Sequence, residues 1–169
     1  MNDIVNRVAE SSLITINLEE LIHSGERVVY DIKDNLFMGL ILKEKDFRAF
    51  IKENDWSTYS GKNVAIINSA EAIVPTWAYM LVATKLQKYA NRYVFGTLEN
   101  LEQTLIQDAI AQINADNYRE ARLVIKGCSN MQIPNYAYVE IMHKLLPVAN
   151  SIMYGEPCST VPIYKKPKP

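Results

Sequence analysis

Cysteine and histidine are scarce in this chain, which contains only two of each. Cys128 and Cys158 are far apart in the sequence, without a CxxC pair or a histidine cluster beside either of them. Two cysteines in a chain of this size do not form a disulfide framework, and in a reducing compartment both would be thiols. A zinc-finger pattern is likewise absent, so any metal site has to be assembled by the fold.

The sequence also lacks the short motifs of common enzyme classes. It contains neither GxGxxG nor GxxxxGK[ST] nor GxSxG, which argues against a dinucleotide-binding Rossmann site, a P-loop NTPase and a nucleophile elbow. The two histidines, His23 and His143, stand outside any recognisable catalytic pattern. An ordinary hydrolase is therefore disfavoured, and the sequence identifies no catalytic residue.

An excess of basic charge and a long apolar run are missing as well. Eighteen Lys and Arg residues stand against nineteen Asp and Glu, which gives a formal net charge of −1 and no basic field for nucleic acid. No uncharged apolar stretch approaches the roughly 20 residues of a membrane helix. The first residues lack the basic and apolar regions of a secretory signal. We therefore expect a cytoplasmic protein without nucleic-acid or membrane partners.

The length and composition are those of a globular protein. The chain has 169 residues, of which 49% are hydrophobic and 22% charged, enough for one ordinary domain with a substantial core. The last residues, Lys165-Lys-Pro-Lys-Pro169, are basic and contain two prolines. We predict a single α/β domain over residues 1–164 and a flexible basic tail over residues 165–169.

Apolar strand-like segments recur from Val64 onward. They begin at Val64, Tyr93, Leu123 and Ile152, at spacings of 29, 30 and 29 residues. A βαβ unit has about this length, roughly 30 residues. The intervening patterns predict helices over residues 75–89, 98–113 and 136–146, the first of them apolar over most of its surface and therefore expected to be buried. Strands that alternate with helices in this way favour a mainly parallel sheet with right-handed crossovers.

The first third of the chain adds further elements. Residues 36–42 can be a strand or can lead directly into the helix that follows. The other expected elements are strands over residues 13–16 and 27–32, a short helix over residues 18–23 and an amphipathic helix over residues 43–54 with Phe47, Phe50 and Ile51 on one stripe. Together the patterns predict a sheet of about five to six strands with helices on both faces, a three-layer sandwich.

Ligands of open α/β sheets bind beyond the carboxyl ends of the strands. The loops at these ends contain our candidate pocket residues, which are Asn68, Ser69, Thr97, Lys126, Gly127, Gly155, Ser159 and Thr160. Trp77 and Tyr79, near the start of an apolar helix, can line a pocket too, although aromatic side chains in that position also serve as core.

Both cysteines fall in these loops. If the last two long strands are neighbours, their ends lie about 5 Å apart, or about 10 Å apart with one strand between them. With Glu156 and Glu71, Cys128 and Cys158 offer the ligand types that bind zinc or iron. Two alternatives stay open: a reactive or reversibly oxidised thiol pair near Lys126, and inert packed thiols.

Several segments resemble a known family. They are Ile41-Leu-Lys-Glu-Lys-Asp-Phe47, Val74-Pro-Thr-Trp-Ala-Tyr-Met80, Lys126-Gly-Cys128 and Gly155-Glu-Pro-Cys-Ser-Thr-Val-Pro162. Over essentially its whole length the chain is similar to a bacterial family known as domain of unknown function 2480. The resemblance implies a single-domain cytoplasmic protein without an established activity, cofactor or catalytic residue, and a link to iron–sulphur cluster assembly.

Two hypotheses on function follow. In the first, the protein is an accessory factor of iron–sulphur, metal or sulphur metabolism that uses its loop thiols, with zinc or iron as the ion. Its partners would be iron–sulphur assembly proteins or further copies of the chain. In the second, it is a non-catalytic small-ligand or protein-interaction module, and the cysteines are structural.

Overall fold

The chain has the predicted α/β fold, and most of its strand pairs are parallel. A computed structural model describes residues 13–127, 132–156 and 158–168. The strands form two smaller sheets, one in each of two compact units, in place of one sheet of five to six strands. Unit 2 is Ser24–Leu105, and unit 1 comprises the residues before and after it. The single domain over residues 1–164 stays a prediction.

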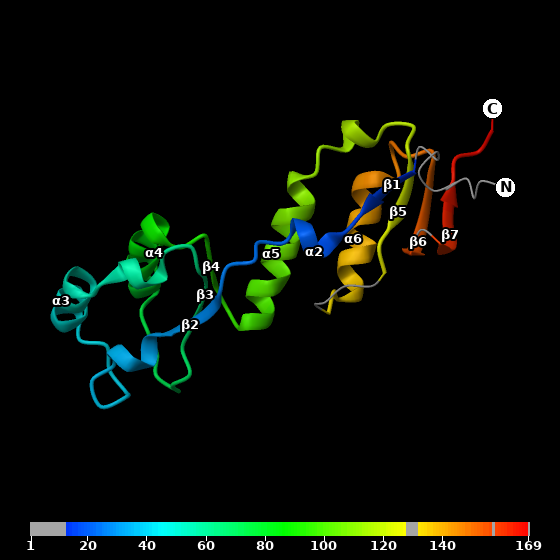
Figure 1. The fold of residues 1–169 in the computed structure, drawn as a ribbon. Coiled ribbons are helices and arrows are strands. Elements are labelled where there is room, and N and C mark those ends of the chain that lie inside the picture. The colour runs from blue at the N-terminus through cyan, green and yellow to red at the C-terminus, as the bar shows by residue number, and fades with distance from the viewer. Residues whose placement is uncertain (1–12, 128–131, 157, 169) are drawn as a thin grey trace, which may run out of the picture. The chain divides into compact units, whose positions relative to one another are not determined.

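The sheet of unit 2 has three parallel strands in the order β2-β3-β4 (Figure 1). They are β2 Arg27–Asp31, β3 Asn63–Ile67 and β4 Arg92–Phe95. The central strand, β3, is buried over its first four residues, as the apolar run at Val64 predicts. β2 and β4 are therefore the two edges of this sheet.

Helices and aromatic side chains form the core of unit 2. The helices are α3 Glu44–Glu53, α4 Thr76–Tyr89 and the 3-10 turns η1 Ile32–Asn35 and η2 Trp56–Tyr59. On α3, Phe47 and Ile51 are buried, which confirms the predicted apolar stripe, and Phe50 is partly buried beside them. These side chains pack with Val64 and Ile66 of β3 and with the buried face of α4.

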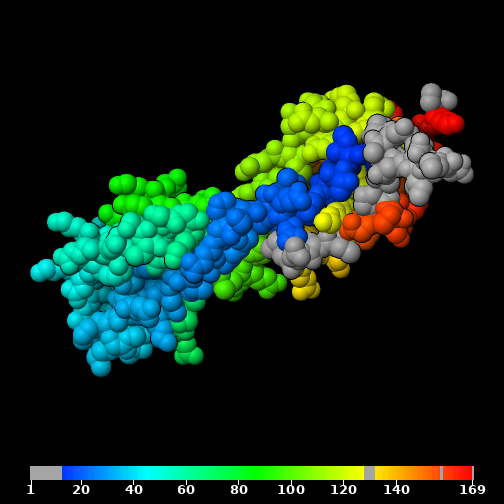
Figure 2. Space-filling model, in the orientation of Figure 1, coloured from blue at the N-terminus to red at the C-terminus, as the bar shows by residue number. Residues whose placement is uncertain are grey.

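Residues 36–42 form a turn in place of a strand, and the chain then leads into α3 at Glu44, as the second expectation had it. An isolated bridge pairs Phe37 with Ile41, and Met38 and Gly39 between them have φ angles of 51° and 72°. Two successive residues in the left-handed region reverse the chain, so the segment cannot continue as a strand or a helix. The turn lies at the surface of unit 2, light blue in Figure 2, and Met38 is 79% exposed.

The sheet of unit 1 has the order β1-β5-β6-β7. β1 Leu13–Ile16, β5 Arg122–Ile125 and β6 Ser151–Glu156 are parallel, and β7 Ser159–Lys165 is antiparallel to β6. α6 Asn135–Leu145 buries Ala137, Ile141 and Leu145, and its Tyr138 ring contacts Tyr154 of β6 edge to face. The shorter elements are α2 Leu18–Leu21 and η3 Ala115–Tyr118.

α5 Leu98–Gln112 contains one of the two points at which the chain passes between the units. Its start is closed by a reciprocal cap, in which the Thr97 amide donates to Asn100 Oδ1 at 2.9 Å and the Asn100 amide donates to Thr97 Oγ1 at 3.3 Å. Within unit 2, Glu102 forms a two-pronged ion pair with Arg27 of β2. None of the described helices has the length and apolar character that a membrane crossing requires.

The end of the chain differs from the predicted loop and tail. Gly155 does not end β6, because the strand runs on to Glu156 and turns back as β7. Pro162 lies in β7, which is an edge strand and therefore tolerates a residue without an amide proton. Lys165 belongs to β7, and the Lys166 amide donates to the Asn150 carbonyl at 2.8 Å. The ordered fold thus extends into the segment predicted as a tail.

Candidate functional site

The predicted site residues divide between the two units. Asn68, Ser69, Glu71 and Thr97 belong to unit 2, and Lys126, Gly127, Gly155, Glu156, Cys158, Ser159 and Thr160 belong to unit 1. Cys128 lies outside the described residues. Of the predicted metal ligands that the structure describes, Glu71 therefore belongs to a different unit from Glu156 and Cys158. The predicted site residues of the two units are therefore described separately.

A network of hydrogen bonds connects the strand ends of unit 2. The carboxylate of Asp31, at the end of β2, accepts hydrogen bonds from the hydroxyl and the amide of Ser69 and from the amide of Lys33. Partial burial raises the pKa of Asp31, but these hydrogen bonds outweigh it and hold the pKa below its ordinary value. The carboxylate therefore fastens the loop after β3 to the end of β2. No sequence pattern had pointed to Asp31.

Asn68 stabilises the loop after β3 through hydrogen bonds within that loop. Its side-chain amide donates to the Ala72 carbonyl at 2.9 Å, and its oxygen accepts from the Ala70 amide at 3.1 Å. Burial raises the pKa of Tyr79 on α4, against a hydrogen bond with Asn68 that lowers it. The Tyr79 hydroxyl is thus protonated at neutral pH. Asn68, Ser69 and Thr97 are engaged in shaping and capping loops, and Glu71 is exposed.

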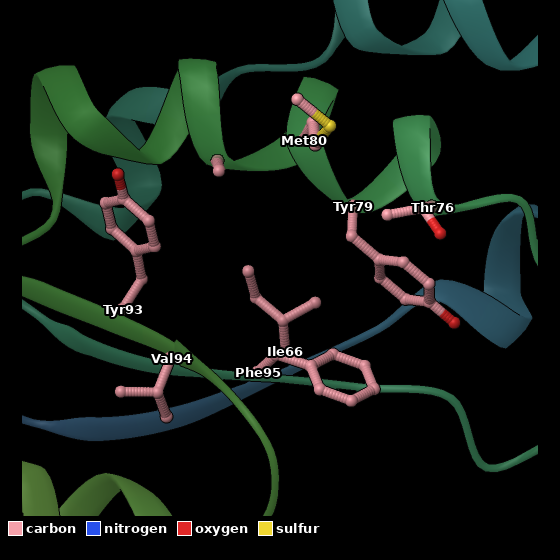
Figure 3. Close-up of a pocket in the computed structure, with 8 residues that line it drawn as sticks. Ile66, Thr76, Tyr79, Met80, Tyr93, Val94 and Phe95 are labelled. Atoms are coloured by element: carbon pink, nitrogen blue, oxygen red, sulfur yellow. The ribbon is translucent and has the colours of Figure 1, made fainter.

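An apolar pocket of about 500 Å³ lies beside this network, between α4 and the edge strand β4 (Figure 3). Its lining comes from one face of the helix, from the strand and from Ile66 of β3. The eight residues are Ile66, Thr76, Tyr79, Met80, Ala83, Tyr93, Val94 and Phe95. None of them carries a charge, so the pocket suits an uncharged group.

Aromatic rings flank the pocket. In Figure 3, Tyr79 and Phe95 stand together on one side, Tyr93 stands on the other, and Ile66 rises between them. The Tyr79 and Phe95 rings meet edge to face with centroids 5.0 Å apart. The Tyr93 hydroxyl donates to Gln87 Oε1 at 2.7 Å, which fixes that ring at the opposite wall. Apart from the two tyrosine hydroxyls, Thr76 adds a third hydroxyl to the lining.

Part of this pocket was visible in the sequence. Thr76, Tyr79, Met80 and Ala83 follow the i, i+3, i+4, i+7 spacing of one helix face. For Tyr79 the sequence left a pocket wall and a core position open, and the helix itself was expected to be buried. The structure buries Ala78, Val82 and Leu86 and leaves Met80 63% exposed. The apolar residues on more than one face of this helix were the signal in the sequence, but the three-stranded sheet that leaves one face uncovered was not predicted.

The site residues of unit 1 surround the ends of β5 and β6, which are neighbours, the first of the two arrangements that the sequence left open. Lys126 and Gly127 directly follow β5. The Tyr154 ring lies against Gly127 so closely that a Cβ atom there would be 2.8 Å from Tyr154 Cζ. Gly127 therefore admits an aromatic ring from the next strand.

The remaining predicted residues belong to a β-hairpin and not to the predicted loop. Gly155 pairs with Thr160 and Glu156 with Ser159, and the turn between the strands exposes Cys158. Oε1 of Glu156 is buried and has no hydrogen-bond partner among the described residues. Across residues 13–127, 132–156 and 158–168, no group of three or more His, Cys, Asp or Glu side chains could hold a metal ion.

Replacement of Gly155, the one glycine in the sequence of this hairpin, is expected to destabilise the protein. Its φ angle is +123°, and a Cβ atom would lie 2.6 Å from the Ser159 carbonyl oxygen, a backbone atom of the paired strand. Gly155→Ala should therefore lower the free energy of unfolding by about 1 to 3 kcal/mol. Denaturant unfolding measures this change.

Gly61→Ala is the matched control for Gly155→Ala. Gly61 also has a positive φ, +70°, but its two chain neighbours aside, no atom of the described residues lies within 4 Å of the place that the methyl group of an alanine would take. It should show only the smaller cost of a left-handed alanine, about 1 kcal/mol. Equal losses in the two variants would show that the close approach to Ser159 does not matter.

Comparison with known proteins identifies a family. The profile of the family described as "Protein of unknown function (DUF2480)" matches residues 2–166. No curated protein and no solved structure shows significant similarity to the chain.

Proposed function

The chain belongs to the DUF2480 family of proteins of unknown function, and we propose that it is a non-catalytic binding module. In this proposal, the pocket between α4 and β4 of unit 2 takes a small apolar or aromatic group. The proposal corresponds to the second hypothesis from the sequence, in which the cysteines have no chemical role.

The pocket itself is the observation that carries this proposal. Its volume of about 500 Å³ lies within the range of about 300 to 1,000 Å³ of small-molecule sites. Such sites combine apolar and aromatic walls with a few hydroxyls that orient the ligand. Here Tyr79, Tyr93 and Phe95 form the walls, and the Tyr79 hydroxyl is held beside Asn68. Because Phe95 is 68% exposed, a ligand would remove apolar surface from water.

The role in iron–sulphur, metal or sulphur metabolism has no comparable support. Cys158 is exposed in a hairpin turn, and Glu71 and Glu156 belong to different units. Proteins of iron–sulphur assembly as partners, zinc or iron as the ion, homo-oligomer formation and a cytoplasmic location stay predictions. The binding proposal depends on none of them.

Titration with p-cresol tests the proposal, because this probe combines an aromatic ring with one hydroxyl. In methyl-resolved NMR spectra of the full chain, we expect saturable shifts of the Ile66, Met80 and Ala83 methyl groups, which belong to pocket residues. A dissociation constant of about 1 mM is reasonable for so small a probe. The exposed methyl groups of Val161 and Ile163 in β7 should not shift.

Filling the pocket should abolish this binding. Ala83→Leu adds a branched side chain to the lining, whereas Thr84→Leu makes a similar side chain at the next, exposed position of α4. We expect Ala83→Leu to weaken p-cresol binding at least about tenfold, or 1.4 kcal/mol, and Thr84→Leu to leave it unchanged. Shifts that do not saturate, or equal binding by both variants, would refute the proposed function.

A further inference from the structure

The pocket adjoins a strand edge, and this edge specifies the kind of ligand. We infer that the occupant is a peptide segment in extended conformation that adds to β4 as a fourth strand and inserts an apolar side chain between α4 and β4. The inference rests on the proposed function and deepens it.

The hydrogen-bond pattern of β4 shows which backbone groups face away from β3. In a parallel pair of strands, every second residue of a strand forms backbone hydrogen bonds with the neighbouring strand, and the residues between them direct their N–H and C=O groups to the other side. The Gly96 amide donates to the Ile66 carbonyl at 3.0 Å, and Ala65 is the ladder partner of Val94. Val94 and Gly96 therefore both direct their backbone groups toward β3. The N–H and C=O groups of Tyr93 and Phe95 point away from β3, to the outer edge of the sheet.

The same two residues line the pocket with their side chains. Tyr93 and Phe95 are two positions apart, so both side chains project from the same face of the sheet, and both belong to the pocket lining. A strand placed at the usual spacing of about 4.8 Å from β4 would direct every second side chain to this face. There that side chain meets Met80 and Ala83 of α4.

The strand edge and the pocket together fit an extended peptide with an apolar side chain. Backbone groups of an edge strand are satisfied by the backbone of another strand, and a groove beside the edge selects its alternate side chains. Because none of the eight lining residues is charged, the inserted side chain should be aliphatic or aromatic. Acidic or basic side chains at that position would lose hydration without a partner.

The test begins with a phage-displayed library of random decapeptides. Peptides are selected on the full wild-type chain and counter-selected on the Ala83→Leu variant, so that only ligands requiring the pocket remain. Amide hydrogen exchange is then measured by NMR with and without a saturating synthetic peptide. We expect exchange at the Tyr93 and Phe95 amides to slow by about tenfold or more, while the Val94 amide, already in the ladder, changes little.

An N-methyl scan of the selected peptide is the matched control. Methylation of the peptide nitrogens that face β4 should abolish binding, and methylation of alternate nitrogens should not. Failure to select a pocket-dependent peptide, or binding without slower exchange at Tyr93 and Phe95, would overturn strand addition. If p-cresol still binds saturably in either case, the proposed function stands and only the class of ligand is wrong; if it does not, both fail.

Discussion

Phe47→Ala is expected to lower the free energy of unfolding by about 3 to 5 kcal/mol. Phe47 is 1% exposed and lies in the core of unit 2, with its ring centroid 6.1 Å from that of Trp77 and 6.4 Å from that of Phe50. Truncation removes these contacts and leaves a cavity that the surrounding rigid rings cannot fill. Urea unfolding followed by Trp fluorescence measures the loss, because Trp56 and Trp77 both belong to this unit.

The control is the same truncation at the surface. Phe37 belongs to the same unit but is 49% exposed, so Phe37→Ala should cost only about 0.5 kcal/mol. If the two variants lose similar stability, Phe47 is not the core residue that the structure shows.

Asn63→Asp should cost about 3 kcal/mol at pH 7. Asn63 begins β3, is fully buried, and donates from its side chain to the Gly25 carbonyl at 2.9 Å while accepting from the Asn91 side chain at 2.7 Å. A carboxylate keeps the second bond but presents an acceptor to the Gly25 carbonyl. Chemical denaturation at several pH values measures the effect.

The pH dependence of this variant has a defined sign. Burial raises the pKa of the introduced carboxyl above its unfolded value, so the folded state binds the proton more tightly than the unfolded state. Stability relative to wild type should therefore recover as the pH falls through the raised pKa, because the protonated carboxyl can donate to Gly25. A loss that is independent of pH would contradict this explanation.

Asn100→Asp is the matched substitution at an exposed amide. The Asn100 oxygen accepts from Thr97 in the first turn of α5, and a carboxylate can accept the same hydrogen bonds at a helix end that favours negative charge. Stability should change by no more than about 0.5 kcal/mol. A large loss here would mean that the charge alone destabilises the fold.

Local sequence patterns predicted most elements but not their assembly into sheets. The four strands expected from Val64 onward are all present, because runs of apolar residues and the helices between them are local features. The pairing of β1 with β5 is not local, since the whole of unit 2 lies between these strands in the chain. Periodic spacing therefore indicated successive strands without revealing that they belong to two sheets.

The hairpin at the end of the chain shows a second limit. The sequence predicts a loop from Gly155 onward, because glycine commonly punctuates a strand. In the fold, Gly155 permits a close approach to Ser159, and Pro162 occupies an edge strand. The candidate site was only partly predictable for a similar reason. The loops at the strand ends follow from the alternation, but the neighbouring pocket depends on how much of α4 three strands can cover.

Binding of an apolar group between α4 and β4 would place the probe within a few ångströms of the pocket methyl groups. Intermolecular NOEs between p-cresol and the methyl groups of the full chain detect that proximity. We expect NOEs from the aromatic protons of p-cresol to Ile66, Met80 and Ala83, whose side chains line one pocket. NOEs to the exposed methyl groups of Val161 or Ile163 instead, or no NOEs at saturating p-cresol, would contradict binding at this place.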